Sequence, residues 1–283
     1  MTAQGLLGYS AALALLLTLL PARGMSAQNV RARDSVQAVP VARRDVPLFR
    51  RTDLLAVAGL GVAVAVTMPR DLRIERDFQQ PGTQSNQTLK VLLKNTGMLG
   101  DPGSVVLSAG LYFAGLGTHS RPLAALGMHT GEAVVLGGVI AELVKGEVGR
   151  ARPKISPNDS RVYRRGKGFS SDDYGSFPSA ETTAAFAAAT ALSREVGREW
   201  PVHSRLVSSL AYAGATLVAG SRLYNNEHWA SDVVAGAGIG SFSAVVFDRY
   251  NQRYPNNVLE RIFLPASIVR YRGLVHVEWS VAR

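Results

Sequence analysis

The chain has 283 residues, of which 47% are hydrophobic and 18% charged, and it contains no cysteine. This length allows one large domain or two small ones, and the hydrophobic content excludes a largely disordered chain. The lack of cysteine excludes disulfides, thiolate zinc sites, iron–sulfur clusters and a cysteine nucleophile. The net charge is +10, and 26 of the 31 basic residues are arginine, which suits bidentate binding of phosphate or carboxylate. Because no basic cluster is interleaved with aromatic residues, we expect no nucleic-acid partner.

The first 52 residues predict export followed by a linker. An apolar run over residues 6–20, then Pro21 and small residues up to Ala27, predict a signal peptide or an N-terminal anchor over residues 1–27. Residues 28–52 are polar and arginine-rich, which is typical of a linker. We therefore expect the protein in the cell envelope, either in the inner membrane with its site facing the periplasm or in the periplasm itself.

Six apolar runs follow and predict an all-α bundle of about six helices over residues 53–250. They are Leu54–Met68, Gly103–Gly117, Ala133–Ile140, Ala184–Leu192, Leu206–Gly220 and Val233–Phe247. The longest runs have 15 residues, about 22 Å as a helix, whereas a bilayer core is ~30 Å thick. Mildly polar flanking residues could extend them, so a membrane bundle and a periplasmic bundle both remain open. The glycines of the segment 236–240 predict close helix packing, since no strand precedes them to form a dinucleotide loop.

Residues 251–283 form a tail with a different pattern. Val275, Val277, Trp279 and Val281 alternate with polar residues, which is the periodicity of a strand. We expect a short β-like hairpin with Ile268–Val269 and assign no chemistry to it.

Two segments at predicted helix ends carry groups that bind anions. Lys145 ends an apolar helix, and Arg152 follows just before Pro153, so two cations stand where a helix ends. Further along, Ser179 and Ala180 open an alanine-rich helix, where a hydroxyl and free backbone N–H groups form an anion site. Taken singly, either segment is compatible with ordinary helix capping.

A third segment adds a cation, an imidazole and a carboxylate. His228 and Asp232 are four residues apart and would share one face of a helix. A carboxylate that accepts one ring N–H leaves the other ring nitrogen as a nucleophile or base. Arg222 lies six residues upstream of His228, and together with the first two segments it makes a purely structural role for this pair unlikely on the pattern alone.

The three segments together resemble the type 2 phosphatidic acid phosphatase and vanadium haloperoxidase superfamily. The pattern of that superfamily is KxxxxxxRP, then PSGH, then SRxxxxxHxxxD, and the resemblance covers about residues 50–250. The positions that match its first and third motifs are Lys145, Arg152, Pro153, Ser221, Arg222, His228 and Asp232.

The resemblance implies a mechanism without a metal or other cofactor. Phosphate would lie among Lys145, Arg152 and Arg222, with hydrogen bonds from the Ser179 hydroxyl and the Ala180 N–H. The ring of His228 would attack phosphorus to form a phosphohistidine, which Asp232 would orient and stabilise. Water would then release phosphate.

The second motif departs from the family at Glu181, which stands where the family has a histidine that assists the leaving group. Three interpretations remain open. Bound phosphate raises the pKa of Glu181, which then acts as a general acid; or Glu181 ionises, pairs with Lys145 or an arginine, and fills the anion site; or the substrate has a good leaving group and needs little acid. Glu181 therefore joins His228 and Asp232 as a candidate catalytic residue.

We expect a phosphatase that acts outside the cytoplasm on a phosphomonoester or pyrophosphate, with a phosphorylated small molecule or lipid as its partner and with membrane association. The alternative from another class is an impaired relative that binds phosphorylated ligands or is structural. A haloperoxidase with vanadate as cofactor ranks lower, because Glu181 replaces an imidazole used there. Outside the motifs, His129 and Glu132 lie one helical turn apart and are expected as buried polar packing or a supporting group, while Glu227 is expected to face solvent.

Overall fold

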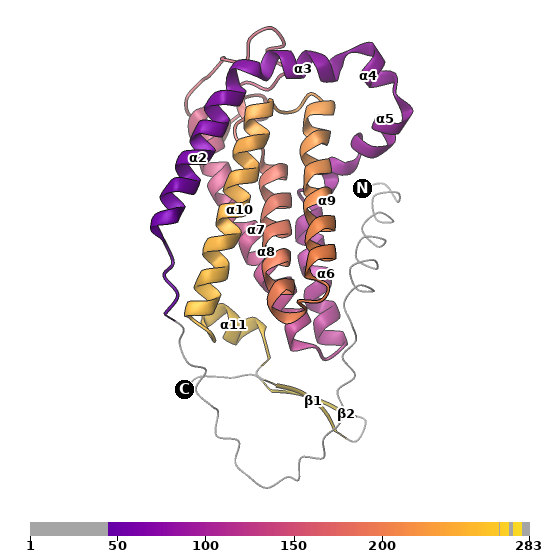
Figure 1. The fold of residues 1–283 in the computed structure, drawn as a ribbon, viewed down its shortest axis with the longest axis vertical. Coiled ribbons are helices and arrows are strands. Elements are labelled where there is room, and N and C mark those ends of the chain that lie inside the picture. The colour runs from indigo at the N-terminus through magenta and orange to yellow at the C-terminus, as the bar shows by residue number, and fades with distance from the viewer. Residues whose placement is uncertain (1–44, 266, 272–273, 279–283) are drawn as a thin grey trace.

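Long helices form the body of the computed structural model, which describes residues 45–265, 267–271 and 274–278 (Figure 1). Six helices of 15 or more residues occur in this described part, and each contains or overlaps one of the six apolar runs. Their bounds are α2 (Arg51–Thr67), α6 (Gly103–Gly117), α7 (Arg121–Val148), α8 (Ala180–Glu199), α9 (Ser204–Tyr224) and α10 (Ala230–Arg253). The predicted all-α bundle is confirmed. The predicted signal peptide or anchor and most of the predicted linker lie outside the described residues.

Helix α8 packs against α7, α9 and α10 and so lies at the centre of the bundle. One buried cluster joins residues of α6, α7, α8 and α9, including Leu111, Leu126 and Leu192. The approach of α10 to α8 depends on glycine, because a Cβ at Gly236 would lie 2.5 Å from the Ser179 carbonyl oxygen and one at Gly240 would lie 2.1 Å from that of Thr183. The close packing predicted for the segment 236–240 is therefore confirmed.

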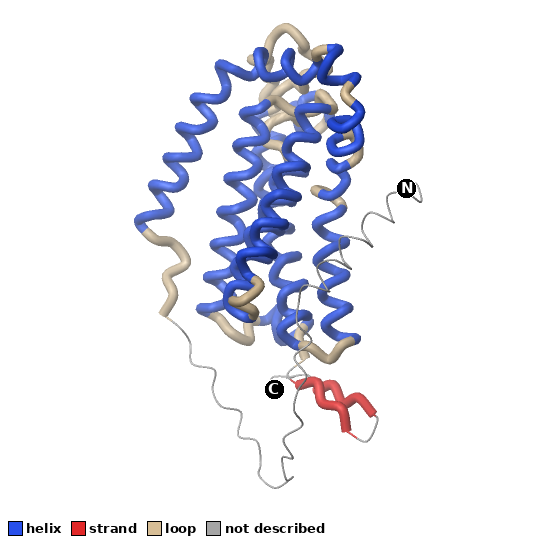
Figure 2. Tube along the Cα trace, turned by 45° about the vertical axis from the view of Figure 1, so that its right-hand side comes forward, coloured by secondary structure: helices blue, strands red, loops and turns tan. Residues whose placement is uncertain are grey.

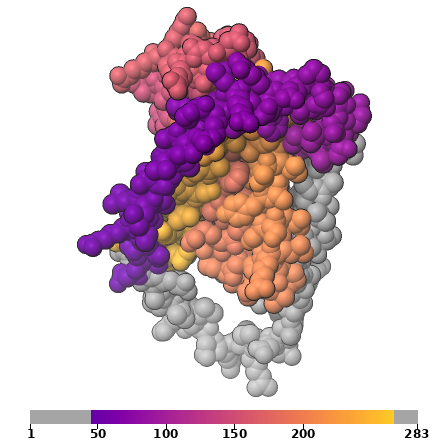
Figure 3. Space-filling view, turned by 45° about the horizontal axis from the view of Figure 1, so that its top comes forward, coloured from indigo at the N-terminus to yellow at the C-terminus, as the bar shows by residue number. Residues whose placement is uncertain are grey.

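A segment of short helices crosses the end of the bundle where α7 and α9 end and α8 and α10 begin (Figures 1 and 3). We call residues 71–99 the strap. It consists of α3 (Asp71–Gln79), α4 (Pro81–Ser85), α5 (Gln87–Leu93) and the 3₁₀ turn η2 (Thr96–Leu99), and a further 3₁₀ turn, η1 (Met68–Arg70), joins it to α2. Side-chain amides of Gln79 and Gln84 donate to the Tyr224 carbonyl at 3.3 and 3.0 Å, which ties the strap to the end of α9.

The outside of the bundle is apolar enough for a membrane. Three stretches in the described part are long and apolar enough to cross one, namely Arg51–Gln79, Arg121–Val148 and Ala230–Arg253. Large apolar side chains on α2 are exposed, with Leu54 and Leu55 72% and 73% accessible. A 28-residue helix such as α7 is about 42 Å long, so the flanking residues supply the length that the apolar runs lack. Of the two arrangements left open by the sequence, the membrane bundle is the one that these helices support.

The tail begins with α11 (Val258–Phe263) and ends in two antiparallel strands, β1 (Ser267–Tyr271) and β2 (Leu274–Glu278), in which Ile268 faces Val277 (Figure 2). The expected hairpin is present over the described residues, although the predicted strand residues Trp279 and Val281 lie outside them. The hairpin lies at the end of the bundle opposite the strap (Figure 1).

Candidate active site

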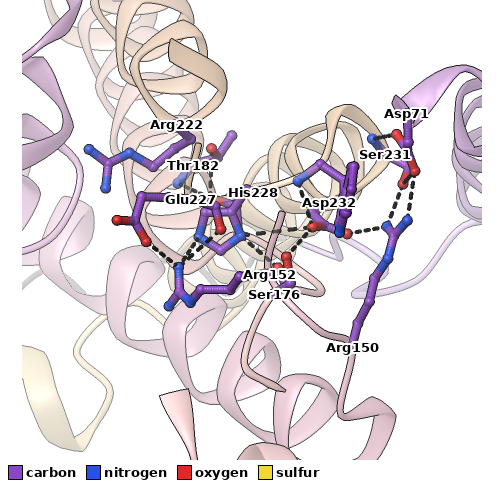
Figure 4. Close-up of polar contacts among 12 residues, drawn as sticks. Asp71, Arg150, Arg152, Ser176, Thr182, Arg222, Glu227, His228, Ser231 and Asp232 are labelled. Atoms are coloured by element: carbon purple, nitrogen blue, oxygen red, sulfur yellow. Dashed lines mark hydrogen bonds and ion pairs between the residues drawn. The ribbon is translucent and has the colours of Figure 1, made fainter. Parts of the chain in front are cut away.

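The segment that follows α7 aims two arginines in different directions. Helix α7 ends at Gly149, whose φ of +58° suits glycine and whose missing Cβ would lie 1.8 Å from the Arg164 carbonyl oxygen. The next residues are held by backbone bonds, from the Ala151 N–H to Val162 and from the Arg152 N–H to Asp173. Arg150 and Arg152 approach different partners, Arg150 reaching Asp71 and Asp232 while Arg152 reaches Asp172 and Glu227 (Figure 4).

Arg152 lies beside the imidazole of His228 and is paired with two carboxylates. Its guanidinium donates to Asp172 Oδ1 at 2.6 Å and to Glu227 Oε2 at 3.0 Å, and its Nη1 is 3.3 Å from His228 Nε2 (Figure 4). Glu227 was expected to face solvent, and it does so only in part: its side chain is 29% exposed and binds Lys154 at 2.8 Å as well as Arg152. Glu227 sits in the loop before α10 and not on a helix, so helical spacing misjudged its direction.

Lys145 belongs to the same end of the bundle but touches none of the other predicted site residues through a hydrogen bond or ion pair given for the described part. Its Nζ donates to Glu142 Oε1 at 2.6 Å. Burial raises the pKa of the Asp172 carboxyl, but the hydrogen bond and charge of Arg152 and the charge of Lys145 outweigh burial and hold that pKa below its usual value. Lys145 thus acts electrostatically on the carboxylate that binds Arg152.

The start of α8 brings a carboxylate into the centre of the site. Ser179 is fully buried and caps the helix, since its hydroxyl accepts the Thr182 N–H at 3.3 Å. Ala180 follows as the first residue of the helix, and Glu181 lies in its first turn. The Glu181 carboxylate accepts a bond from Arg222 Nη1 at 3.1 Å, and its other oxygen lies 3.2 Å from His228 Nε2 and 3.5 Å from the Ser179 hydroxyl.

Glu181 is held in its ionised form by these neighbours. Burial raises the pKa of its carboxyl, but the hydrogen bond and charge of His228 and the charge of Arg222 lower it further, so that the pKa lies well below its usual range. Glu181 pairs with an arginine, as the second of the three interpretations of this residue expects.

Arg222 reaches the site from the last turn of α9 and lies under the strap. A Cβ on Gly97 of η2 would fall 1.4 Å from Arg222 Nη2, and one on Gly100 would fall 2.5 Å from the Glu181 carbonyl oxygen. The backbone at the end of the strap therefore packs directly on the Arg222–Glu181 pair.

His228 does not lie on a helix, contrary to the expectation that it shares a helical face with Asp232. It lies in the loop between α9 and α10, because Asp232 Oδ2 accepts the Trp229 N–H at 2.9 Å and so starts α10 after the histidine. His228 Nδ1 is 2.6 Å from the Ser176 carbonyl oxygen, whereas Asp232 Oδ2 is 3.9 Å away. A carbonyl only accepts, so Nδ1 carries the hydrogen and Nε2 faces Arg152 and Glu181. The direct orienting bond expected from Asp232 is thus supplied by Ser176.

Asp232 is bound instead to groups that sequence reasoning did not select. It accepts from Arg150 Nη1 at 2.5 Å and from the Ser176 hydroxyl at 2.6 Å. Arg150 also donates to Asp71 Oδ2 at 2.7 Å. Arg150 stands inside the first motif segment, where a second arginine near Arg152 was a visible signal, but nothing in the sequence marked Asp71.

The structure therefore brings seven of the eight predicted site residues into one connected neighbourhood, with Lys145 beside them. Their elements are the ends of α7 and α9, the starts of α8 and α10, and the loops between them (Figure 4). Within the described ranges, no three His, Asp or Glu side chains are arranged to bind a metal ion. The arrangement of cations, a hydroxyl and an imidazole nitrogen around a carboxylate can bind an oxyanion and attack it.

Comparison with known proteins finds a family model and two proteins that are similar to this chain. Residues 126–255 match the model of the PAP2 superfamily. The part of the chain that carries the candidate site is therefore similar to the PAP2 superfamily. All eight predicted site residues lie within the matched PAP2 region, whereas the strap and Asp71 precede it.

The chain is also similar to two proteins with assigned activities. The chain is 43% identical over 65 residues to a lipid A 1-phosphatase from Porphyromonas gingivalis, a stretch that spans 23% of this chain and 14% of that protein. The fold resembles that of a transmembrane PAP2 type phosphatidylglycerolphosphate phosphatase from Bacillus subtilis, with a TM-score of 0.50 and 18% identity over 72% of this chain and 97% of that one. The structural likeness shows a shared fold, and three stretches in the described part of this chain are long and apolar enough to cross a membrane.

Proposed function

We propose that the protein is a phosphatase that hydrolyses a phosphomonoester or pyrophosphate through a phosphohistidine intermediate. The observation that carries this proposal is the position of the Glu181 carboxylate, which lies within 3.5 Å of Arg222, His228 Nε2 and the Ser179 hydroxyl. A carboxylate is an oxyanion, and it stands where these groups converge. A phosphoryl group that displaces it would meet two arginines, a hydroxyl and a ring nitrogen.

The proposed cycle gives each step to a named residue. The Ser176 carbonyl holds the Nδ1–H of His228, so Nε2 is the ring nitrogen that faces the anion position. Nε2 attacks phosphorus while the bond to the leaving oxygen breaks, and Arg152 and Arg222 stabilise the charge that develops on the phosphoryl oxygens. Water then attacks the phosphohistidine, returns the imidazole and releases phosphate.

Glu181 takes two roles in this cycle. In the free enzyme it is ionised and paired with Arg222, so substrate must displace it; its side chain is 22% exposed, which leaves it a path outward. Once a phosphoryl dianion stands beside it, repulsion between like charges raises the pKa of the carboxyl, which then carries a proton for the leaving oxygen. We therefore expect the enzyme to be most active at acidic pH, or with substrates whose leaving group needs little protonation.

A second candidate function follows from the same contact. If substrate does not displace Glu181 from Arg222, the Glu181 carboxylate blocks the anion position. The protein would then bind phosphorylated ligands weakly or serve a structural role. The pairing distance of 3.1 Å is the specific observation that favours this alternative.

For the substrate, we propose a lipid phosphate that the site meets at the membrane surface outside the cytoplasm. Both named relatives act on phosphorylated lipids, and three stretches of this chain can cross a membrane. The site lies at the end of the helices and not at their middle, so a headgroup at the bilayer surface could reach it (Figure 1).

The test is phosphate release by the full chain in detergent, with a phosphomonoester, pyrophosphate and a phosphorylated lipid as substrates, from about pH 4 to pH 8. We expect turnover that His228→Ala abolishes, with His203→Ala as the matched control, since His203 precedes α9 at the far end of that helix. Brief incubation with radiolabelled substrate should label the wild type through an acid-labile bond and leave His228→Ala unlabelled. A wild-type chain without turnover on any of the three substrates would favour the blocked site, and halide oxidation upon addition of vanadate would favour the haloperoxidase.

A further inference from the structure

A fully buried ion triad lies beside the candidate active site, and the mechanism above does not use most of it. Asp71, Arg150 and Asp232 have side chains that are 0% exposed. Arg150 donates from Nη2 to Asp71 at 2.7 Å and from Nη1 to Asp232 at 2.5 Å, and both its Nε and Nη2 donate to the Ser160 carbonyl. Burial lowers the pKa of the Arg150 guanidinium, but the charges of Asp232 and Asp71 raise it further, so this arginine stays charged. Every strong donor of Arg150 is therefore committed, and the side chain has one position.

Asp71 binds the start of α10 as well as Arg150. Its Oδ1 accepts the Ser231 N–H at 2.9 Å, and its Oδ2 accepts the Ser231 hydroxyl at 2.6 Å. The N–H of Ser231 lies in the first turn of α10, where backbone N–H groups have no partner within the helix. A carboxylate at this end also interacts favourably with the helix dipole. The first residue of the strap thus fixes the helix that carries Asp232.

A continuous path of hydrogen bonds leads from the triad to the nucleophile. Asp232 Oδ2 accepts the Ser176 hydroxyl at 2.6 Å, and the Ser176 carbonyl accepts the Nδ1–H of His228 at 2.6 Å. Asp232 also accepts the N–H of Trp229, the residue after the histidine. Both the ring and the backbone of His228 are therefore placed by groups that Asp232 holds, and Asp232 is itself held by Arg150 and Asp71 (Figure 4).

We propose that Asp71, acting with Arg150, is a positioning residue for His228. This inference rests on the proposed function and assigns to that site a residue that lies outside the matched PAP2 region of 126–255. Only the 3₁₀ turn η1 separates Asp71 from α2, so the position of α2 is linked to the direction of the attacking nitrogen. Neither Asp71 nor Arg150 contacts the anion position, and their effect passes through Asp232 and Ser176.

The test compares Asp71→Asn with Asp77→Asn, a substitution at an exposed carboxylate on the same helix. The amide keeps the size of the side chain but removes the charge that holds Arg150. We expect Asp71→Asn to lower kcat by about 10- to 100-fold while KM changes less than about threefold, because misplacing a reacting group costs this much in rate without removing a ligand contact. Asp77→Asn should leave both constants unchanged.

A readout that needs no turnover separates this inference from the proposed function. The chain has five histidines, so selective ¹⁵N labelling gives few ring signals, and the His228→Ala variant assigns the one of His228. In the wild type we expect a hydrogen-bonded Nδ1–H signal, which Asp71→Asn shifts or broadens and Asp77→Asn leaves in place. An inactive wild type with this pattern would overturn the proposed function and keep the positioning role.

A wild-type ring signal together with wild-type kcat in Asp71→Asn overturns the positioning role. So does a loss of kcat that comes with an unchanged ring signal. If Asp71→Asn does not fold, Ser231→Ala decides the question, because it removes only the hydroxyl between Asp71 and Arg150 and keeps the charges. A Ser231→Ala variant with unaltered kcat and ring signal would equally overturn the proposal.

Discussion

Two groups of ion pairs at the same end of the bundle differ in their access to solvent. The inner group joins Arg150 to Asp71 and Asp232, and all three side chains are 0% exposed. The outer group joins Arg152 to Asp172, which is 75% exposed, and Arg222 to Glu181, which is 22% exposed. A buried pair has no solvent or ligand to exchange with, whereas an exposed carboxylate can leave its arginine to another anion. The inner group therefore sets the shape of the site and the outer group binds what enters it.

The largest expected effect separates the two groups by stability. Arg150→Met should lower the free energy of unfolding by about 3–5 kcal/mol, because it leaves two buried carboxylates without their cation. Arg152→Met should cost less than about 1 kcal/mol through its pair with the solvated Asp172. Thermal or denaturant unfolding of the purified chain in detergent measures both. Equal losses for the two variants would remove the distinction between the groups.

The next effect concerns the outer carboxylate that fills the anion position. Glu181→His should raise the rate of phosphate release by up to about 100-fold, since it replaces an ionised competitor by a group that can donate a proton to the leaving oxygen. Glu181→Gln should bind inorganic phosphate more tightly than the wild type and yet turn over more slowly than Glu181→His. A Glu181→Ala variant with unchanged strong activity would eliminate the acid role of this residue.

The pH dependence of phosphate binding sharpens the same point. The pKa of Glu181 in the folded protein lies well below the usual 4.5 of a glutamic acid, so the carboxylate is ionised above that value and its pairs weaken only at more acidic pH. The tighter phosphate binding of Glu181→Gln, about tenfold relative to the wild type, should therefore persist from neutral pH down to about pH 5. Calorimetric titration with inorganic phosphate measures it. An advantage that disappears as pH falls from 7 to 5 would mean that Glu181 takes up a proton in this range, either in the free enzyme or when phosphate binds.

The smallest effect tests whether the outer pairs exchange freely. Asp172→Asn should strengthen phosphate binding by no more than about fivefold, because an exposed carboxylate competes weakly for Arg152. Asp173→Asn is the matched control, being adjacent and having no ion pair in the described part. A gain in phosphate affinity of more than tenfold would mean that the Arg152–Asp172 pair is as strong as the pairs of the inner group, although Asp172 is exposed.

Much of the fold could be predicted from the pattern of apolar and polar residues along the sequence. Six apolar runs gave six helices, the hairpin followed from alternation, and Gly236 and Gly240 packed as their size suggested. The motif residues were found because chemistry fixes their types and spacing. Arg222 and Arg152 lie 70 residues apart in sequence, and only their shared motif pattern suggested that they meet.

Errors arose where direction depended on the end of a helix. Spacing placed His228 and Asp232 on one helical face, but Asp232 caps α10 and leaves the histidine in the preceding loop. The same end of the helix turned Glu227 toward Arg152, so that it faces solvent only in part. A carboxylate in the first turn and one in the middle of a helix look alike in sequence, and only the hydrogen bond to the cap tells them apart.

The sequence by itself determined the class of fold, the number of long helices in the described part, and the set of groups available for phosphate chemistry, since these follow from periodicity and residue type. Only the tertiary structure decided which carboxylate pairs with which arginine. Asp71 and Glu181 are both acidic residues in the first turn of a helix, yet the side chain of Asp71 is fully buried with Arg150 and that of Glu181 is partly exposed beside Arg222. The strength of an ion pair depends on the solvent around it, and the solvent around a side chain is fixed by the packing of distant segments.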